Sequence, residues 1–394
     1  MSFFDWLDPR TNYRAAKAHL LDEKLPPGTG WWFVTGSIML LLLGVQLITG
    51  IVLAMYYVPS PEYAYDSLRF IMDQLAFGHI VRGLHSFGAS FIVVGSVVHM
   101  LRVVLLGSYK KPREVTWLTG VLLLLIIMGF ALSGYLLPWD QRAYWATTVT
   151  INIARGTPII GEQVASVMRG GSSLGALTLL RWYAAHVFLL PAALIAFTIS
   201  HLYLMRRHGI SGPPVPVEGE SKPFFPTHVL KDTIVMAAVF AALFTVAVQV
   251  RAPLEAIADP SDASYVPRPE WYFLFLFRFL EFKEISQFGV AFGAIYIPTL
   301  LMGIVFLMPF IGKKQWGHYF NRGFLLAILT GITILTVMTL HEDSHNQPHQ
   351  AKLKFAERDA HRVVVLAKRE GIPQNGAREL LVNDPFSQGP RLFA

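Results

Sequence analysis

The chain has 394 residues, of which 53% are hydrophobic and only 15% are charged. A soluble protein of this length would need more charged residues to cover its surface, so the composition excludes an ordinary soluble globular protein. The chain contains no cysteine, which excludes disulfides, thiolate-held iron–sulfur clusters and CxxCH haem attachment within it. The net charge is a modest +7, and no basic patch with interleaved aromatic residues indicates a nucleic-acid partner.

Residues 1–30 contain acidic and basic residues that interrupt any apolar run. This pattern is not that of a signal peptide, and it predicts an amphipathic N-terminal segment that lies on the membrane surface. Charge-free windows of membrane-spanning length follow, since about 20 apolar residues are needed to cross a bilayer. There are seven of them: 31–61, 83–101, 115–139, 182–205, 233–250, 285–312 and 323–340.

The windows predict an all-α transmembrane fold with seven spanning helices in two blocks. A Gly/Pro-rich linker at 209–226 separates a four-helix block, 31–208, from a three-helix block, 227–340. Residues 341–394 are polar, and we expect them to form an external tail.

Positive charge divides the connecting loops into two sets. The loops 102–114, 206–232 and 313–322 hold eleven Lys and Arg residues, whereas the loops on the other side hold ten in about twice the length. The positive-inside rule places the first set in the cytoplasm. The N-terminus is then cytoplasmic and, after seven crossings, the tail is outside.

Histidines occur in pairs within two of the apolar windows. In "GLHSFGASFIVVGSVVHML", His85 and His99 are fourteen residues apart, which in an α-helix is roughly 21 Å along the axis and roughly 40° of rotation. In the fourth window His186 and His201 are fifteen apart, roughly 22 Å and roughly 60°. Imidazole in lipid needs a partner, and haem iron is one. Two such helices therefore predict two bis-imidazole haem sites at two depths of a four-helix di-haem bundle.

Glycines and arginines extend this pattern. Two glycine pairs share the fourteen-residue spacing: Gly36 with Gly50, and Gly120 with Gly134. Backbone without a Cβ would leave room for two flat porphyrins, although such glycines also serve plain helix packing. Cations that could pair with haem propionates lie near the histidines: Arg82, Arg102, Arg206 and Arg207.

Four motifs identify a family: "GSYKKPREVTWLTGVLLL", "GYLLPWDQRAYWA", "RWYAAHVFLLP" and "PEWY". Over about residues 25–340 the chain resembles cytochrome b of the quinol:cytochrome c oxidoreductases, the cytochrome bc family. The fifteen-residue histidine spacing, the "KKPRE" loop and seven rather than eight helices are closer to the plastid type, as though cytochrome b6 and subunit IV were fused.

The resemblance implies a complete electron-transfer subunit. His85 with His186 would hold the outer b-type haem, and His99 with His201 the inner one. The subunit would oxidise quinol outside, pass electrons to a quinone site inside, and contribute to a proton gradient across a bacterial plasma membrane. The implied partners are a Rieske iron–sulfur protein, a c-type cytochrome subunit, a second copy of the chain in a homodimer, and membrane lipid.

Two positions depart from the family pattern. Phe33 stands where the plastid type has a cysteine that tethers an extra haem, so no such link is possible here. Arg206 stands where the bc type has a histidine at the inner quinone site, as in the plastid type. The motif "FFPTHVLKD" places Lys231 and Asp232 at the inner surface, where they exchange protons with quinone or, alternatively, form a positive-inside anchor with an acidic helix start.

The motif "PRPEWYFLF" predicts the outer quinol site. Its prolines prevent regular helix, so the chain turns just before Glu270. A carboxylate at the edge of an apolar pocket can accept a proton from a quinol hydroxyl, with Tyr272 as a quinol-orienting phenol. The alternative makes Glu270 an acid favoured by a helix dipole. Tyr144 either lines the same pocket or is an interface aromatic.

Two other functions would use some of the same residues. A di-haem anchor subunit of a dehydrogenase would explain the histidines but not "PEWY". A transporter would use intramembrane histidines as proton relays. The ending "GIPQNGARELLVNDPFSQGPRLFA" resembles the lead-in to a class I cytochrome c domain. We therefore expect the tail either to contact a c-type cytochrome partner or to be a truncated or differently encoded relic of one.

Overall fold

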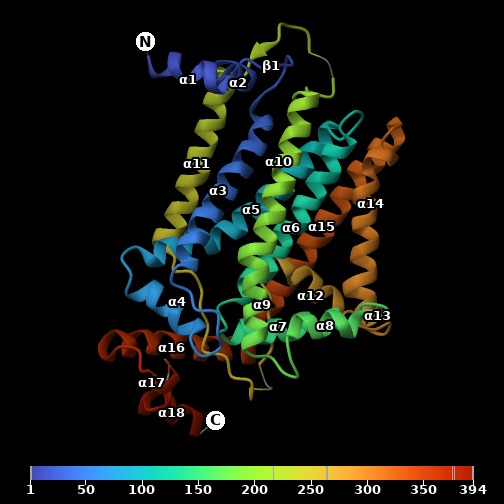
Figure 1. Ribbon diagram of the computed structural model, residues 1–394. Coiled ribbons are helices and arrows are strands. Elements are labelled where there is room, and N and C mark those ends of the chain that lie inside the picture. The colour runs from blue at the N-terminus through green and yellow to red at the C-terminus, as the bar shows by residue number, and fades with distance from the viewer. Residues whose placement is uncertain (1, 216, 263–264, 375, 377, 393–394) are drawn as a thin grey trace.

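The computed structural model describes residues 2–215, 217–262, 265–374, 376 and 378–392. Long parallel and antiparallel helices dominate it (Figure 1), which confirms the all-α transmembrane fold. Among the described residues, seven helical spans are long and apolar enough to cross a membrane, and each overlaps one window expected from the sequence. They are Trp31–Ala54, Gly78–Leu106, Glu114–Leu136, Ala176–His208, Thr227–Gln249, Phe292–Ile311 and Gln315–His345.

The first four spans form the bundle that carries the histidines. They comprise η1 (Trp31–Val34) with α3 (Thr35–Ala54), α5 (Gly78–Leu106), α6 (Glu114–Leu136), and α9 (Ala176–Ala184) joined to α10 (Leu190–His208) by the π-helical turn η2 (Ala185–Leu189). Helix α3 packs along α5, and α6 packs along α10. In lipid a helix satisfies its own backbone polar groups, which is why these charge-free runs are helical. Helix α5 ends at Gly107 in the left-handed conformation.

The last three spans pack on the outside of this bundle. Helix α11 (Thr227–Gln249) lies against α5 and α3, while α14 (Ile297–Ile311) and α15 (Gln315–His345) lie against α6 and α5. Buried side chains join the two blocks: Leu42, Ile92 and Ile127 with Leu243 in one cluster, and Val104, Trp117 and Val121 with Met308 and Leu325 in another.

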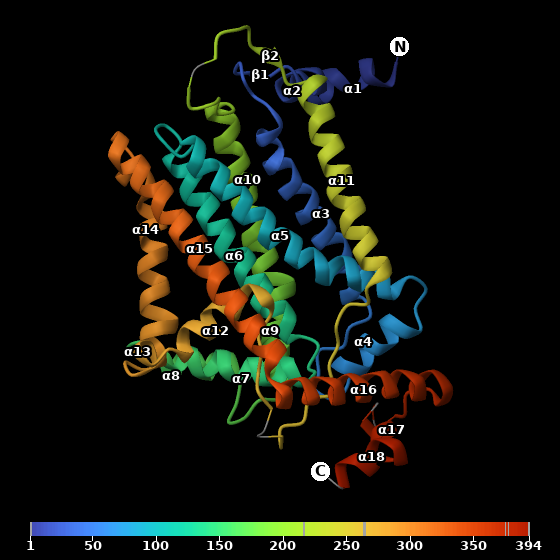
Figure 2. The same cartoon turned by 180° about the vertical axis from the view of Figure 1, so that it is seen from behind.

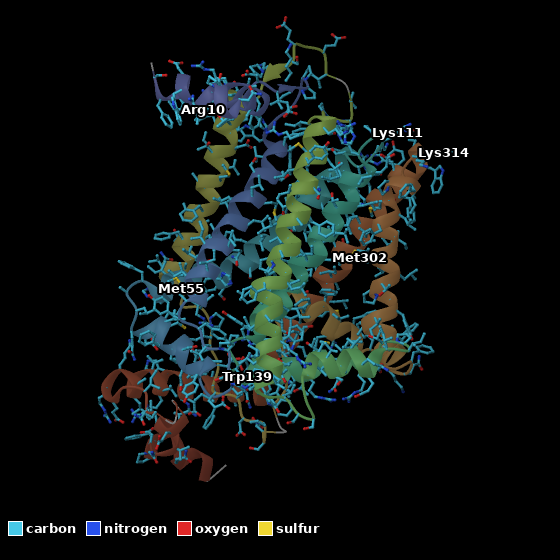
Figure 3. All side chains as sticks on the ribbon, viewed as in Figure 1. Arg10, Met55, Lys111, Trp139, Met302 and Lys314 are labelled. Atoms are coloured by element: carbon cyan, nitrogen blue, oxygen red, sulfur yellow. The ribbon has the colours of Figure 1, made fainter. Side chains whose placement is uncertain are left out.

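The basic loops meet at one end of the molecule. There α1 (Phe3–Thr11) and α2 (Tyr13–Leu21) lie across the helix ends, and β1 (Lys24–Leu25) pairs antiparallel with β2 (Lys222–Pro223) of the linker (Figure 2). Figure 3 shows Arg10, Lys111 and Lys314 at this end and Trp139 at the other. We call the first the inner end and the second the outer end, after the charge distribution.

Short helices build the outer end. The connections contain α4 (Ala64–Asp73), α7 (Gln141–Arg155), α8 (Gly161–Arg169), η3 (Trp271–Phe273), α12 (Leu274–Glu281) and α13 (Lys283–Ser286). The π-helical turn η4 (Phe292–Tyr296) begins the sixth span. After α15 the tail forms α16 (Gln347–Glu370), α17 (Arg378–Val382) and α18 (Pro385–Leu392). These tail helices pack on α4 through a buried cluster that includes Tyr65, Val363, Leu366 and Leu380.

Candidate functional site

The four intramembrane histidines face one another in two pairs inside the bundle. His85 from α5 and His186 from η2 have ring centroids 6.3 Å apart, with the rings inclined at 75°. His99 from α5 and His201 from α10 lie close enough to interact electrostatically. Each pair thus takes one histidine from α5 and one from the fourth span.

The π-helical turn explains why the two helices have different histidine spacings. A π turn accommodates one extra residue without extending the helix as an α-helical residue would. Because η2 contains His186, the fifteen residues from His186 to His201 correspond to the fourteen from His85 to His99. The straight α-helix assumed from the sequence, with its roughly 60° offset, is wrong here for that reason.

Each histidine Nδ1 meets a hydroxyl from a neighbouring helix. The separations are 3.0 Å for Thr49 Oγ1 with His85, 2.8 Å for Ser133 Oγ with His186, 3.0 Å for Thr35 Oγ1 with His99, and 3.0 Å for Thr119 Oγ1 with His201. Sequence reasoning missed these hydroxyls. The signal was present, because each is the residue before one of the four glycines, in a Thr-Gly or Ser-Gly pair.

The hydroxyls fix which imidazole nitrogen is free. Thr49 donates its proton to the Val45 carbonyl at 2.6 Å, and Ser133 donates to the Gly129 carbonyl at 2.8 Å. Thr119 likewise donates to the Thr116 carbonyl, at 2.9 Å. A hydroxyl whose proton is committed in this way accepts the Nδ1–H, so Nε2 keeps its lone pair. That is the tautomer that metal ligation through Nε2 requires.

The four glycines lie against the imidazoles. A Cβ added at Gly134 would lie 2.7 Å from His186 Cε1, and Cβ atoms at Gly50 and Gly120 would each lie 3.1 Å from the Cε1 of a histidine. At Gly36 the corresponding distance, to His99, is 3.7 Å. The immediate role of these glycines is thus to admit the imidazole ring. Partly buried imidazoles on two levels, three of them with the Nε2 lone pair left free, fit the ligand set of two haems.

The four arginines named from the sequence differ in their surroundings. Arg82 is buried and donates to the carbonyls of Ala252 and Pro253, at 2.9 and 2.8 Å. Arg102 lies over the Phe33 ring at 4.1 Å, and its Nε is buried without a hydrogen-bond partner. Arg206 forms an ion pair with Glu23, and Arg207 is exposed. Arg102 is therefore the arginine with a buried donor still to be satisfied.

Glu270 lies at the outer end, where the chain enters η3. Its carboxylate makes no capping hydrogen bond to the turn and instead accepts from Arg142 Nη1 at 2.8 Å. Arg142 Nε also donates to Glu255 at 2.9 Å, so one guanidinium joins two carboxylates from the 251–270 segment. Sequence reasoning missed Arg142 and Glu255, although Arg142 belongs to the quoted "PWDQRAYW" motif.

Tyrosines surround this ion-pair group. Tyr272 is buried beside Phe273, and burial raises its pKa, with Glu270 adding to the effect. Tyr135, at the end of α6, also interacts electrostatically with Glu270. Tyr144 instead packs against Trp139 and Trp145, with ring centroids 5.8 and 5.5 Å away.

Asp140 links α7 to the segment that carries Glu255. One carboxylate oxygen accepts from the backbone N–H of Ala143 and the other from that of Glu255, both at 2.9 Å. Burial, together with the charge of Glu255, raises the pKa of Asp140 to about 6. Burial would lower the pKa of Arg142, but the surrounding carboxylates outweigh it and raise that pKa, so the guanidinium is charged.

At the inner end Lys231 lines a cavity of about 500 Å³ between the N-terminal segment and the linker. Its Nζ lies 5.7 Å from the centre of the Trp31 ring. Asp232 is buried, and its Oδ1 lies 3.8 Å from His228 Nε2. His228, which sequence reasoning did not name, lines the same cavity.

Known proteins are similar to this chain in both sequence and fold. A family model described as cytochrome b/b6/petB matches residues 20–209. Cytochrome b6 of Synechococcus elongatus is 38% identical over 210 residues, which cover 53% of this chain and 98% of that protein. The menaquinol:cytochrome c reductase cytochrome b subunit of Bacillus subtilis is 40% identical over 218 residues, covering 53% and 97%.

A solved structure extends the similarity beyond the first four spans. A chain of a hyperthermophilic respiratory Complex III matches with a TM-score of 0.70 and 26% identity, covering 86% of this chain and 99% of that one. The curated relatives, which this chain covers almost entirely at 38% and 40% identity, establish the family. The chain belongs to the cytochrome b/b6 family.

Proposed function

We propose that the chain is the di-haem cytochrome b subunit of a quinol:cytochrome c oxidoreductase, or of a complex with a similar acceptor. The observation that carries the proposal is the fourfold repeat of a hydroxyl-paired imidazole beside a glycine. His85 and His186 would hold an outer b-type haem, and His99 and His201 an inner one. When bound, the haems supply one-electron carriers at two depths of the membrane.

The outer end is suited to oxidising quinol. Glu270 would accept a quinol proton, since a positioned carboxylate acts as a general base. Arg142 would be its positioning residue through the 2.8 Å ion pair. The buried phenol of Tyr272 would orient the quinol ring, with Tyr144 in the aromatic cluster behind it. Arg102 offers a buried unpaired donor for an anionic haem substituent.

The inner end would reduce quinone. Lys231 and Asp232 would supply protons there, next to the cavity that Lys231 lines. Arg206 and Arg207 would contribute positive charge on the same side. Protons would thus be released and taken up at opposite ends, so turnover would contribute to a proton gradient.

Location and partners follow the same proposal. The Lys/Arg-rich loops support a bacterial plasma membrane with a cytoplasmic N-terminus and an external tail. Residues 31–208 would form the haem domain and 227–340 the quinol-site domain. The chain has no cysteine for an iron–sulfur cluster, so the first electron would leave to a Rieske protein and then to a c-type cytochrome. The Bacillus subtilis name and the Complex III title support such a complex. Within it the chain would pair with a second copy as a homodimer.

Spectra and haem counts on the purified complex test this function. We expect two b-type haems per chain, and His186→Leu and His201→Leu should each remove one and leave the other. Glu270→Gln should abolish most quinol turnover without changing the haem count. A complex with no b-type bands would instead favour a transporter. Intact b-type bands with Glu270→Gln turnover equal to wild type would favour an anchor subunit.

A further inference from the structure

A second cavity at the inner end lies apart from every residue assigned to quinone or haem above. It has a volume of about 560 Å³ and lies between the end of α5, the first two turns of α15, and the linker at 211–215. Its lining includes Leu106, Lys110, Pro213, His318, Tyr319 and Arg322. We call it the basic cavity, because no carboxylate is among the described residues that line it, whereas Glu218 and Glu220 line the cavity beside Lys231.

Arg322 brings an unsatisfied donor to this cavity. One terminal nitrogen of its guanidinium donates to the Leu105 carbonyl at the end of α5. Its Nε is buried and has no acceptor within the described part of the chain. Buried polar groups in proteins are normally hydrogen-bonded, so an orphaned guanidinium N–H indicates a missing acceptor.

His318 offers a second donor through a buried hydrogen-bond chain. The Tyr109 hydroxyl oxygen accepts from Asn321 Nδ2 at 3.0 Å and lies 2.7 Å from His318 Nδ1. Donation from the Tyr109 hydroxyl to Nδ1 would leave the imidazole proton on Nε2. Lys110 lies near enough to His318 to act on it electrostatically, as does Arg322. Three donor residues, two of them positively charged, thus line a cavity with no carboxylate among its described lining residues.

Exposed aromatic residues lie beside the basic cavity on α15. Trp316, Tyr319 and Phe320 are 66%, 58% and 43% exposed, and their spacing places them on one face of the helix. They occur in the first two turns of the span Gln315–His345, at the depth where aromatic side chains meet the lipid headgroups. A small soluble anion would have no use for this aromatic face.

We propose that the basic cavity binds the phosphate of an anionic phospholipid, whose acyl chains lie along the exposed face of α15. Arg322 and Lys110 supply the charge, and His318 Nε2–H supplies a neutral hydrogen bond. Basic pockets between spanning helices on the cytoplasmic side are suited to such headgroups. The lipid would tie α5, α15 and the linker together at the inner surface.

Lipid binding by the intact, delipidated complex tests the proposal. Native mass spectrometry would follow titration with phosphatidylglycerol, with phosphatidylcholine and inorganic phosphate as separate arms. Arg322→Gln and Lys110→Gln should each weaken phosphatidylglycerol binding by about fivefold. Lys314→Gln is the matched control, because it removes one charge from the same end without touching the cavity. It should change binding by less than about twofold.

The arms have distinct consequences. Preference for phosphatidylglycerol over phosphatidylcholine, weakened by the two cavity variants only, would support the lipid site. Equal binding of the two lipids would overturn it, as would equal losses in all three variants. Displacement of phosphatidylglycerol by millimolar inorganic phosphate would assign the cavity to a free anion and overturn the lipid assignment. The haem count of each variant should equal that of wild type, which separates this test from that of the proposed function.

Discussion

Ser133 Oγ lies 2.8 Å from His186 Nδ1, and the same hydroxyl donates its proton to the Gly129 carbonyl. The serine therefore acts as an acceptor for the imidazole, and it both orients the ring and increases electron density on it. The bond joins α6 to the π turn between α9 and α10, so it also fixes the relative position of these helices at the level of one proposed haem.

Ser133→Ala should weaken the proposed outer haem site without unfolding the bundle. Loss of an outer-shell partner typically costs about 10–100-fold in metal affinity, and we expect haem affinity to fall within that range. In protein that keeps the outer haem, the midpoint potential of that haem should rise, because a less electron-rich His186 imidazole stabilises ferric iron less. Titration of the purified protein with haem measures the affinity, and redox titration of the b-band absorbance measures the potential. Thr245→Ala removes a similarly back-bonded hydroxyl on α11 and is the control. An unchanged potential in Ser133→Ala would contradict the assigned tautomer.

The glycines predict a graded series of alanine variants. Gly134→Ala places a Cβ 2.7 Å from His186 Cε1, so the ring must move, whereas Gly36→Ala places one at an ordinary 3.7 Å from His99. We expect Gly134→Ala to lose the haem at His186 and Gly36→Ala to keep both haems. Pyridine haemochrome assays give haem per chain. Gly44→Ala, which has open space around it, is the control. Equal loss in Gly36→Ala and Gly134→Ala would show that contact with the imidazole is not the cause.

Much of this site could be predicted from residue spacing, since spacing on a helix fixes which residues share a face. The spacing of His85 and His99 could place two ligands at two depths because α5 is regular. The π turn at His186 could not be inferred, because no local residue pattern distinguishes it from an α-helix. The union of Arg142 with Glu255 and Glu270 joins segments more than a hundred residues apart, and no periodicity encodes such a contact.

Asp140 predicts a pH-dependent stability at the outer end. Its native pKa is raised from 3.8 to about 6, so the folded state binds more protons than the unfolded state between these values. Stability from this group therefore falls as pH rises across that window, by on the order of 3 kcal/mol at most. Asp140→Asn, which cannot ionise, should gain relative to wild type between pH 4 and pH 7. Apparent Tm at the two pH values measures the gain.

Glu284→Gln on α13 provides the control for that experiment. Glu284 is exposed, so this variant removes a carboxylate from the same end of the molecule without changing a buried group. A Tm difference between Asp140→Asn and wild type that is constant across the window would contradict the raised pKa.

Arg362 and Asp384 predict the behaviour of the tail. Their side chains pair at 2.6 Å, and this hydrogen bond, against some burial, lowers the pKa of Asp384 to about 2. Because the pKa is lowered, the stabilisation is present above about pH 4 and disappears as pH falls toward 2. Asp384→Asn should speed amide exchange in α17 and α18, while α16 stays protected through the bond from Arg69 to the Ala360 carbonyl. Arg358→Gln, on the same helix, should leave exchange unchanged; faster exchange there would indicate a general loss of tail structure.

Arg142 predicts the proton chemistry of the outer site. Its guanidinium holds Glu255 at 2.9 Å and Glu270 at 2.8 Å, so in the proposed function it would act on quinol only through them. Arg142→Gln would leave two neighbouring carboxylates without a cation, and their repulsion would be relieved when one takes up a proton. A protonated Glu270 cannot accept from quinol, so turnover should fall at least about tenfold at neutral pH and recover partly as pH rises. Arg142→Lys keeps the charge and should restore the pH profile, though not the two-pronged geometry.

Variants of the two glutamates then show which carboxylate accepts the quinol proton and which only helps to position Arg142. Glu270→Gln removes the proposed acceptor and should abolish most turnover at every pH, whereas Glu255→Gln leaves the Arg142–Glu270 pair and should retain most activity. Steady-state quinol oxidation across pH 6 to 9, with haem content as the folding check, distinguishes them. Should Glu255→Gln be the more damaging change, the quinol proton would leave through Glu255. The Tyr265 hydroxyl, which donates to Glu255 at 2.7 Å, would then be the next group on its route.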